Sequence, residues 1–272
     1  MQWTLASASG NVFAYAWARE APSSFQGPDA ARRLCPRGTG LGLDGIFLLE
    51  DPEPGGVWRM DHWDADGART FCSNGTRAAL AVAGAPQGGP LAVESSGETV
   101  RLRRDGGEVG LRMPEGEDCR LSEPPVETLE PSIRGWIGNP QLVLEVPSAD
   151  RADLAALAPP LRFHPAFPDG TNVNVVEVLR EGEGRIRSWE RGVEGETLCC
   201  GTGCAVAGAW LAERSGCMEW RLQTASPDPV RVTVGRIRQG AWEDLWVWGR
   251  VRCLGTVVPD PSLGLESGPW NG

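Results

Sequence analysis

Two cysteines lie at equivalent places in a repeated stretch of the sequence. The segments GARTFCSNGT and GETLCCGTGC align without gaps at an offset of 128 residues, which places Cys72 on Cys200. In each copy the cysteine precedes a small apolar run, residues 76–85 and 204–214, whose alanine and leucine content favours a helix. A helix N-terminus stabilises negative charge, and a thiol placed there usually has a pKa below its ordinary value of about 8.5. The pair therefore predicts a site in which two similar acid–base groups act together.

Other residues repeat at the same offset, which indicates a duplicated half. Gly10-Asn11 aligns with Gly138-Asn139, and Asp44 aligns with Asn172. A fixed internal period is the sequence signature of a repeated structural unit. In each half, segments with strand patterns surround the expected helix, so we expect an α+β protein of two similar lobes. The active site would then lie in the cleft between the lobes, where both cysteine loops can meet.

The expected lobes are residues 1–121 and residues 122–254, with the tail 255–272 as a candidate completion of the first lobe. The segment 122–132 is rich in proline and glutamate and is the expected crossing between the lobes. A helix is expected over residues 149–157 of the second lobe.

The composition limits the chemistry. The sequence contains no lysine, so all 26 basic residues are arginine, and the formal net charge is −10. A Schiff base to pyridoxal phosphate needs a lysine amine, so amino-acid chemistry here must proceed without that cofactor. Only two histidines and no paired C-x-x-C motif accompany the cysteines, so no metal site is expected.

The same composition bears on partners and on location. An acidic chain without a basic stripe gives no support to nucleic-acid binding. No apolar run approaches the roughly 20 residues of a membrane helix, and the N-terminus lacks the pattern of a secretory signal. Eight cysteines are few for a disulfide scaffold of this length. We therefore expect a cytoplasmic protein that does not bind membranes.

Seven motifs occur in a fixed order along the chain. They are GNVF at 10–13, GLGLDG at 40–45, DADG at 64–67, CSNGTR at 72–77, GNP at 138–140, FPDGTNVNVVEV at 167–178 and ERGVEGETLCCGTG at 190–203. In this order they resemble the diaminopimelate epimerase family and, more distantly, cofactor-independent racemases such as proline racemase. The resemblance implies a duplicated fold in which each lobe is a mixed or antiparallel barrel-like sheet around a central helix.

The resemblance also implies an activity, which is the interconversion of LL- and meso-diaminopimelate in lysine and cell-wall synthesis. Cys72 and Cys200 match the two catalytic cysteines, so one would remove the α-proton as a thiolate and the other would return a proton as a thiol. The substrate would be a small amino acid, no metal or organic cofactor would be required, and relatives of this kind often form homodimers. The sequence does not say which cysteine is the base in which direction.

Substrate-binding positions carry over from the same resemblance. The backbone N–H groups of Asn74, Gly201 and Thr202 are placed to hold the charge that develops on the substrate carboxylate. For Asn11 and Asn139 a turn role is an equal alternative. The full set of matching substrate-binding positions is Asn11, Asn74, Asn139, Asn172, Glu190, Arg191, Gly201 and Thr202, of which Glu190 and Arg191 look like a clamp for the distal carboxylate and ammonium.

Four positions depart from the family pattern, namely Asp64 in place of Asn, Gln141 in place of His, Ser73 in place of Gly and Val12 in place of Asp. Gln141 cannot exchange a proton, and the charge of Asp64 would favour an ammonium over a carboxylate. Two alternatives therefore stay open. One is a racemase of another amino acid on the same scaffold, and the other is a ligand-binding protein that has lost turnover.

Overall fold

The computed structural model describes residues 1–52, 57–85, 91–260 and 263. It divides into two compact units, which are Met1–Leu111 together with Arg250–Gly272, and Arg112–Gly249. Most of the C-terminal tail, residues 261–262 and 264–272, lies outside the described part, so its expected role as a completion of the first lobe is addressed only up to residue 260 and at Leu263.

The unit boundaries differ from the expected ones. Residues 112–121 belong to the second unit and residues 250–254 to the first. The long strand β16 (Ala241–Val257) accounts for the second difference, because it pairs with β15 up to Trp248 and with β1 from Val251 onward. A single strand thus begins in one unit and ends in the other.

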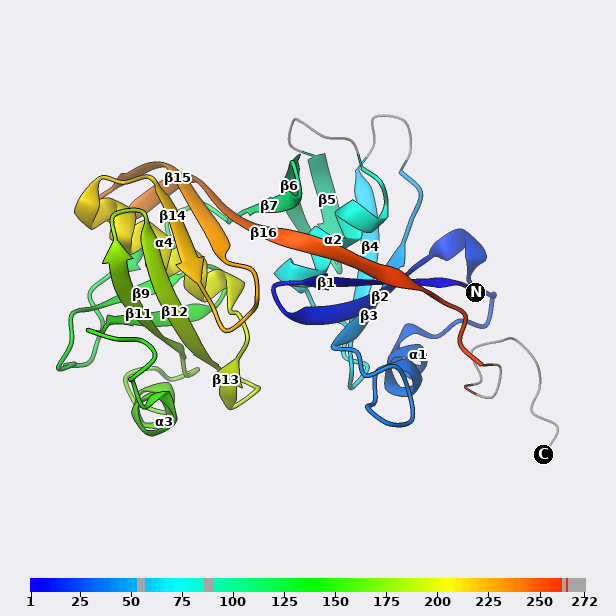
Figure 1. Cartoon of the computed structure of the whole chain (residues 1–272), viewed down its shortest axis with the longest axis horizontal. Helices are drawn as coiled ribbons and strands as arrows, with labels where there is room; N and C mark the ends of the chain where they lie inside the picture. The colour runs from blue at the N-terminus through cyan, green and yellow to red at the C-terminus, as the bar shows by residue number, and fades with distance from the viewer. Residues whose placement is uncertain (53–56, 86–90, 261–262, 264–272) are drawn as a thin grey trace. The chain divides into compact units, whose positions relative to one another are not determined.

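Eight strands of the first unit close into a barrel around a helix (Figure 1). They are hydrogen-bonded in the order β1 to β7 and then β16, which also pairs with β1. The central helix α2 (Ser73–Val82) contacts β1, β2, β3 and β6, and α1 (Gly27–Leu34) packs against β3 and β4. The elements not yet given are β1 (Trp3–Ala8), β2 (Asn11–Trp17), η1 (Ala18–Glu20), β3 (Gly45–Leu49), β4 (Trp58–Asp64), β5 (Leu91–Ser95), β6 (Glu98–Asp105) and β7 (Glu108–Arg112).

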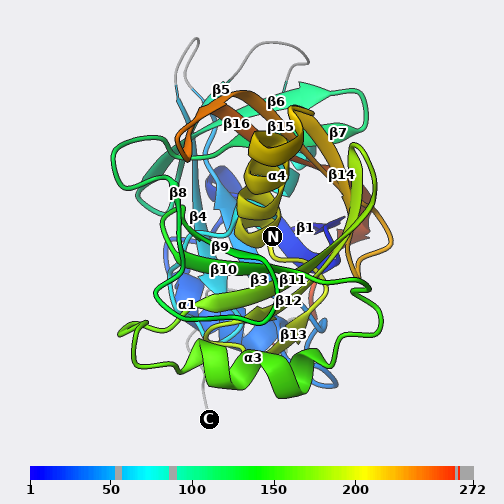
Figure 2. The ribbon, with the colours of Figure 1, turned by 90° about the vertical axis from the view of Figure 1, so that its left-hand side faces the viewer.

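The second unit wraps its sheet around the longer helix α4 (Gly201–Ser215), as Figure 2 shows. The strand order is β16, β15, β14, β12, β11, β10, β9, β8, and a bridge between Arg120 and Ala241 joins the two ends. Residues 203–212 of α4 are all buried, as expected for a helix that is apolar around its whole circumference. Among the described residues, no helix is long and apolar enough to cross a membrane. The other elements are β8 (Leu121–Ser122), β9 (Ser132–Trp136), β10 (Pro140–Glu145), α3 (Leu154–Arg162), β11 (Asn172–Arg180), β12 (Glu183–Glu190), β13 (Gly195–Thr197), β14 (Glu219–Gln223) and β15 (Val230–Arg238).

The two units share one pairing scheme, which confirms the duplication. Going from β1 to β6, the neighbouring pairs are antiparallel, parallel, antiparallel, parallel and antiparallel. The same alternation runs from β9 through β10, β11, β12 and β14 to β15. The central helices begin at Ser73 and Gly201, which are separated by the repeat offset. Each unit is therefore a mixed barrel-like sheet around a central helix, as predicted.

The helix expected over 149–157 was placed wrongly. The structure has α3 at Leu154–Arg162, with Asp153 as the N-cap residue whose side chain accepts from the Ala156 N–H at 3.1 Å. Pro159 and Pro160 lie inside this helix, although proline removes a backbone donor and usually ends a helix. The sequence pattern favoured an end before the prolines, and packing against β11 and β12 keeps the helix intact beyond them.

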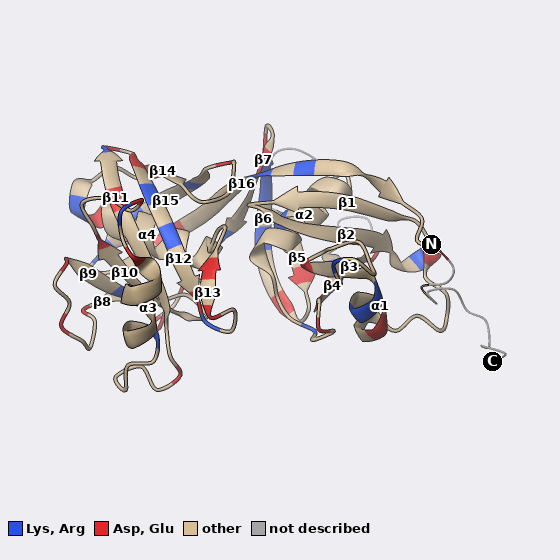
Figure 3. Cartoon of the chain, turned by 60° about the horizontal axis from the view of Figure 1, so that its bottom comes forward, with Lys and Arg blue, Asp and Glu red and all other residues tan. Residues whose placement is uncertain are grey.

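Acidic and basic residues are interspersed on the ribbons of both units (Figure 3). Many of the arginines pair with a carboxylate of their own unit, for example Arg187 with Glu196 at 2.7 Å and Arg162 with Glu194 at 2.7 Å. Such partly exposed pairs contribute about 0–1 kcal/mol each. They add little to stability, and the cores around α2 and α4 are what position the cysteine loops.

Candidate active site

Cys72 and Cys200 are the N-cap residues of the two central helices. Both have extended backbone conformations, with φ and ψ of −127° and 112° at Cys72 and of −99° and 105° at Cys200. The first N–H groups of a helix have no partner within it, so each sulfur lies beside backbone donors and at the positive end of the helix dipole. The two units therefore present the same local arrangement of thiol and helix, each within its own barrel.

In the first unit, a buried polar cluster holds the side chain of Asn74. Its Nδ2 donates to Asn11 Oδ1 at 2.9 Å, and its Oδ1 accepts from the Arg77 guanidinium at 2.6 Å. Arg77 is only 1% exposed and also donates to Ser9 Oγ at 2.8 Å. The structure thus brings the predicted residues Asn11, Cys72 and Asn74 together, and it adds Arg77, for which the sequence analysis assigned no role.

Burial raises the pKa of Cys72 to about 11. The N–H groups of Gly75 and Asn74 oppose this change, as does the charge of Arg77, whereas Asp64 adds to it. Desolvation therefore exceeds the stabilisation of the thiolate by the helix N-terminus. This differs from the lowered pKa that the sequence position predicted.

In the second unit, the sulfur of Cys200 has three polar neighbours, which are Gly203, Thr202 and Glu190. The Gly203 N–H donates to Cys200 Sγ at 3.4 Å, and Thr202 Oγ1 lies 3.5 Å from the same sulfur. Gln141 Nε2 donates to Thr202 Oγ1 and to Asn139 Oδ1, both at 3.0 Å. The predicted residues Asn139, Cys200 and Thr202 therefore lie in one hydrogen-bonded group, and Gln141 connects them.

Asn174 and Ser188 extend this group, although the sequence analysis did not select them. Asn174 Nδ2 donates to Gln141 Oε1 at 2.9 Å, and Ser188 Oγ donates to Asn174 Oδ1 at 2.7 Å. A signal for Asn174 was present, because residues two apart on a strand share one face and Asn174 follows Asn172 by two. Gly203 packs directly on this amide, since a Cβ there would lie 2.2 Å from Asn174 Oδ1.

Glu190 is the third neighbour of Cys200, and it accepts a hydrogen bond from Thr197 Oγ1. Burial raises the pKa of Glu190, while hydrogen bonds from Thr197 and Cys200 lower it. The pKa of Cys200 is itself strongly raised, first by burial and then by the charge of Glu190.

Arg191, the expected partner of Glu190 in a clamp, is exposed and turns elsewhere. Its backbone N–H donates to Asn172 Oδ1 at 2.7 Å, and its guanidinium donates to the Asp169 carbonyl at 2.9 Å. Glu190, the last residue of β12, therefore lies beside the Cys200 thiol, whereas the side chain of Arg191 lies at the surface.

The departures from the family pattern lie in the first unit as well as at Gln141. Thr70 Oγ1 donates to Asp64 Oδ2 at 2.8 Å, and Asp64 Oδ1 is 3.6 Å from Nε2 of the buried His62. Val12 donates its backbone N–H to Asp44 Oδ2 at 2.7 Å. Ser73 is the first residue of α2, so its backbone N–H lies at the helix N-terminus just as the N–H of a glycine at this position would.

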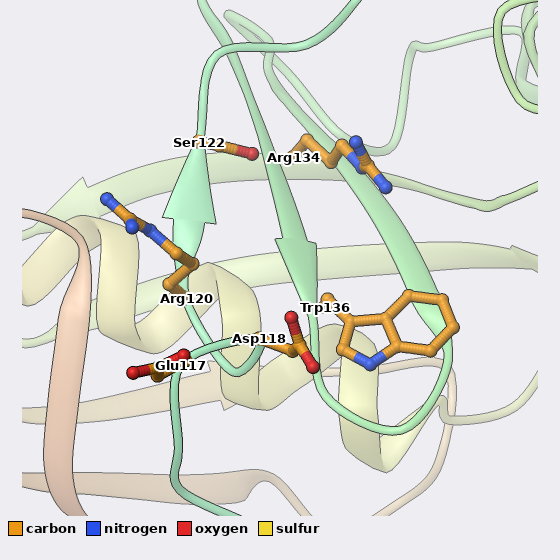
Figure 4. A pocket seen from close by; sticks show the side chains of 6 residues that line it. All are labelled: Glu117, Asp118, Arg120, Ser122, Arg134 and Trp136. Carbon is orange, nitrogen blue, oxygen red and sulfur yellow. The ribbon is translucent and has the colours of Figure 1, made fainter.

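A surface pocket lies elsewhere in the second unit (Figure 4). In that view the guanidinium groups of Arg120 and Arg134 point to opposite sides. The residues that line it are Glu117, Asp118, Arg120, Ser122, Arg134 and Trp136. None of these lining residues is a thiol or an imidazole, and the charges do not converge on one point. The cysteine loops are therefore the candidate site for chemistry.

Comparison with known proteins agrees with these features. The family model for diaminopimelate epimerase matches residues 136–228. A diaminopimelate epimerase of Gemmatimonas aurantiaca is 32% identical over 245 residues, covering 87% of this chain and 86% of its own length.

Two solved structures share the fold. A PhzF-family phenazine biosynthesis protein of Bacillus anthracis has a TM-score of 0.67 at 15% identity over 94% of this chain and 98% of its own. A hydroxyproline epimerase of Agrobacterium vitis has a TM-score of 0.57 at 16% identity over 97% and 94%. The chain therefore belongs to the diaminopimelate epimerase family, whose epimerases act without pyridoxal phosphate.

Proposed function

We propose that this protein interconverts LL- and meso-diaminopimelate, with Cys72 and Cys200 as the acid–base pair. The observation that carries the proposal is the equivalent placement of the two thiols at the N-termini of the duplicated central helices. Inverting a carbon centre requires a proton to leave one face and another to arrive at the opposite face, so two groups are needed. A duplicated unit supplies two such groups, one from each copy.

In the proposed reaction, one thiolate removes the α-proton and the other thiol donates a proton to the opposite face. The electron pair left by the C–H bond spreads onto the substrate carboxylate in the transition state. The N–H groups of Asn74, Gly201 and Thr202 would bind that carboxylate, because donors fixed where charge develops lower the barrier. After one turnover the two cysteines have exchanged protonation states, so the reverse reaction uses the same groups.

The asparagines Asn11 and Asn139 are suited to orient the substrate. Each uses its Oδ1 atom inside its own unit, to accept from Asn74 and from Gln141 respectively. No other hydrogen bond of these two side chains occurs among the described residues, so each amide nitrogen can donate to a ligand. Asn172 accepts from the Arg191 backbone N–H, and both residues stay in the proposal, with Glu190, as substrate-binding positions. Because Glu190 lies beside Cys200 and the Arg191 guanidinium donates to the Asp169 carbonyl, these two side chains would bind different parts of the substrate. For Asn11 and Asn139, an amide nitrogen that can donate to a ligand supports a binding role over a turn role alone.

The same proposal includes the setting of the enzyme. An epimerase of diaminopimelate would serve lysine and cell-wall synthesis in the cytoplasm, and the protein would work as a homodimer of the kind that is common among its relatives. No metal or organic cofactor enters the proposed reaction.

A racemase of a different amino acid is the second candidate, and Asp64 is the observation that favours it. Its carboxylate side chain is 45% exposed, and it adds to the pKa increase of Cys72, so it bears on the same site. A negative charge there would select a cationic group on the substrate and oppose a carboxylate.

Exchange of the α-proton in heavy water tests the proposal. The purified protein would be incubated with diaminopimelate and, separately, with a panel of other amino acids, and deuterium incorporation would be followed by mass spectrometry. We expect rapid exchange with diaminopimelate. Exchange confined to another amino acid would establish the second candidate, and tight binding of diaminopimelate without exchange would mean a binding protein.

A further inference from the structure

The second unit contains a continuous chain of neutral hydrogen bonds that ends at Cys200. It runs from Ser188 through Asn174, Gln141 and Thr202 to the sulfur. Ser188, Asn174 and Gln141 are at most 1% exposed, so their hydrogen bonds are sheltered from water. Leaving any of these groups unpaired would cost free energy, which makes the direction of each bond well determined.

The directions follow from one fixed acceptor. Asn174 Nδ2 lies 3.1 Å from the Leu142 carbonyl oxygen, which can only accept, so this atom must be the amide nitrogen. The Gln141 atom that faces Asn174 Nδ2 must then be its oxygen, and Gln141 turns its nitrogen towards Thr202. Both N–H groups of Gln141 are used, one on Asn139 and one on Thr202.

Thr202 is therefore an acceptor towards Gln141, and its single hydroxyl hydrogen remains to be donated. Among the described residues, the other hydrogen-bond partner of Thr202 Oγ1 is Cys200 Sγ, at 3.5 Å. A thiolate can only accept, so a donor held in this direction stabilises the charged sulfur. The hydrogen bond from Thr202 indeed lowers the pKa of Cys200, against the larger effects of burial and of Glu190.

This chain is specific to the second unit. At the repeat offset, Phe13 stands in place of Gln141 and Ile46 in place of Asn174, and neither can hydrogen-bond through its side chain. Cys72 instead lies near the charged Arg77. The groups that act on Cys200 from the neighbouring elements are Glu190 on β12, Cys199, and the Thr202 and Gly203 donors of α4. Of these groups, Glu190 and Cys199 disfavour the thiolate, and the neutral donors Thr202 and Gly203 favour it.

We propose that Gln141 is a positioning residue that fixes the Thr202 hydroxyl as a hydrogen-bond donor to Cys200 and so favours the thiolate of that cysteine. The catalytic meaning of this inference rests on the proposed function, but the inference itself concerns the acidity of a thiol and can be measured without substrate.

The test compares alkylation of Cys200 by iodoacetamide across a pH series, with Cys199 resolved from Cys200 by fragmentation mass spectrometry. Thr202→Val removes the hydroxyl and keeps the shape, whereas Thr202→Ser keeps the hydroxyl and is the matched control. We expect Thr202→Val to shift the alkylation midpoint upward by about one pH unit, which is about tenfold slower alkylation below the midpoint. Thr202→Ser should retain the original midpoint. An unchanged midpoint in Thr202→Val would overturn the proposal.

The role of Gln141 is tested by a double-mutant cycle. Gln141→Leu alone should raise the midpoint, because the Thr202 hydroxyl loses the donor that orients it. In the Thr202→Val background, the same substitution should add nothing, because Gln141 acts only through the hydroxyl. An equal shift in both backgrounds would contradict the inference. Thermal melts check that each variant is folded, and the Thr202 pair decides the first step even if Gln141→Leu does not fold.

The outcome can be separated from that of the proposed function. If the midpoints shift as expected and α-proton exchange with diaminopimelate is absent in the unmodified protein, the proposed function fails and the positioning role stands. If exchange is present and the midpoints do not move, the positioning role fails alone.

Discussion

The two candidate thiols differ in the charge that lies beside each of them. Near Cys72, the carboxylate of Asp64 raises the pKa of the thiol, and the buried guanidinium of Arg77 lowers it by a smaller amount. Cys200 has Glu190, whose charge raises its pKa. The duplicated helices thus provide equivalent sulfur positions, while side chains that differ between the units set the acidity of each. Cys72 should therefore form the thiolate more readily than Cys200.

Removing these charges should move the two thiols in opposite directions. Arg77→Met removes the cation, so the pKa of Cys72 should rise further above 11, and alkylation of Cys72 should require a higher pH. Glu190→Gln removes the neighbouring negative charge, so the pKa of Cys200 should fall and its alkylation should begin at a lower pH. We expect shifts on the order of one pH unit, read from site-resolved alkylation midpoints.

Arg77→Lys is the matched control for the first change, because it keeps the charge and loses the planar fork of donors. Its midpoint for Cys72 should stay closer to that of the unmodified protein than the midpoint of Arg77→Met. Shifts of the same sign in Arg77→Met and Glu190→Gln would rule out the electrostatic assignment.

At the scale of elements, close packing between helix and strand places the second thiol. The first turn of α4 lies against β11 so tightly that Gly203 has no room for a side chain next to Asn174. In the first unit Gly75 is equivalent, and a Cβ there would lie 2.3 Å from the Phe47 ring. A glycine three residues after each cysteine therefore lets the helix approach the sheet at the point where the loop begins.

Gly203→Ala should accordingly destabilise the protein and displace the cysteine loop. Overpacking against a buried side chain costs about 1–3 kcal/mol, and the shift should also slow α-proton exchange. Gly195→Ala is the control, because a Cβ at Gly195 would have no contact closer than 3.9 Å. Urea unfolding would measure both variants, and equal midpoints for the two would contradict the packing argument.

The sequence predicted some of these elements and not others, for physical reasons. The cysteine loops and both central helices were predictable, because their motifs and apolar runs are local signals. The end of α3 was not, since tertiary packing kept a helix where Pro159 and Pro160 indicated its end. Gln141 was identified as a departure, but its hydrogen bonds to Thr202 and Asn174 join residues 61 and 33 positions away, and no local pattern predicts such contacts.

At the scale of the whole molecule, duplication explains why one chain carries a cysteine at the N-terminus of each of two similar central helices. Both units repeat one alternation of parallel and antiparallel pairs around a central helix. The fold is shared with solved proteins at identities near 15%, so the architecture constrains few side chains. The polar residues around each thiol diverged between the units, whereas the cysteine at the helix N-terminus is present in both.

The most direct test of the account is the rate of interconversion of LL- and meso-diaminopimelate by the Cys72→Ala and Cys200→Ala variants. Alanine can neither take nor give a proton, and a positioned acid or base contributes about 10²–10⁴-fold to a rate. Chiral chromatography would follow both directions, and melting curves would show that both variants fold. The account predicts that each variant loses interconversion at least about 100-fold in both directions. Interconversion at the unmodified rate by either variant would contradict it.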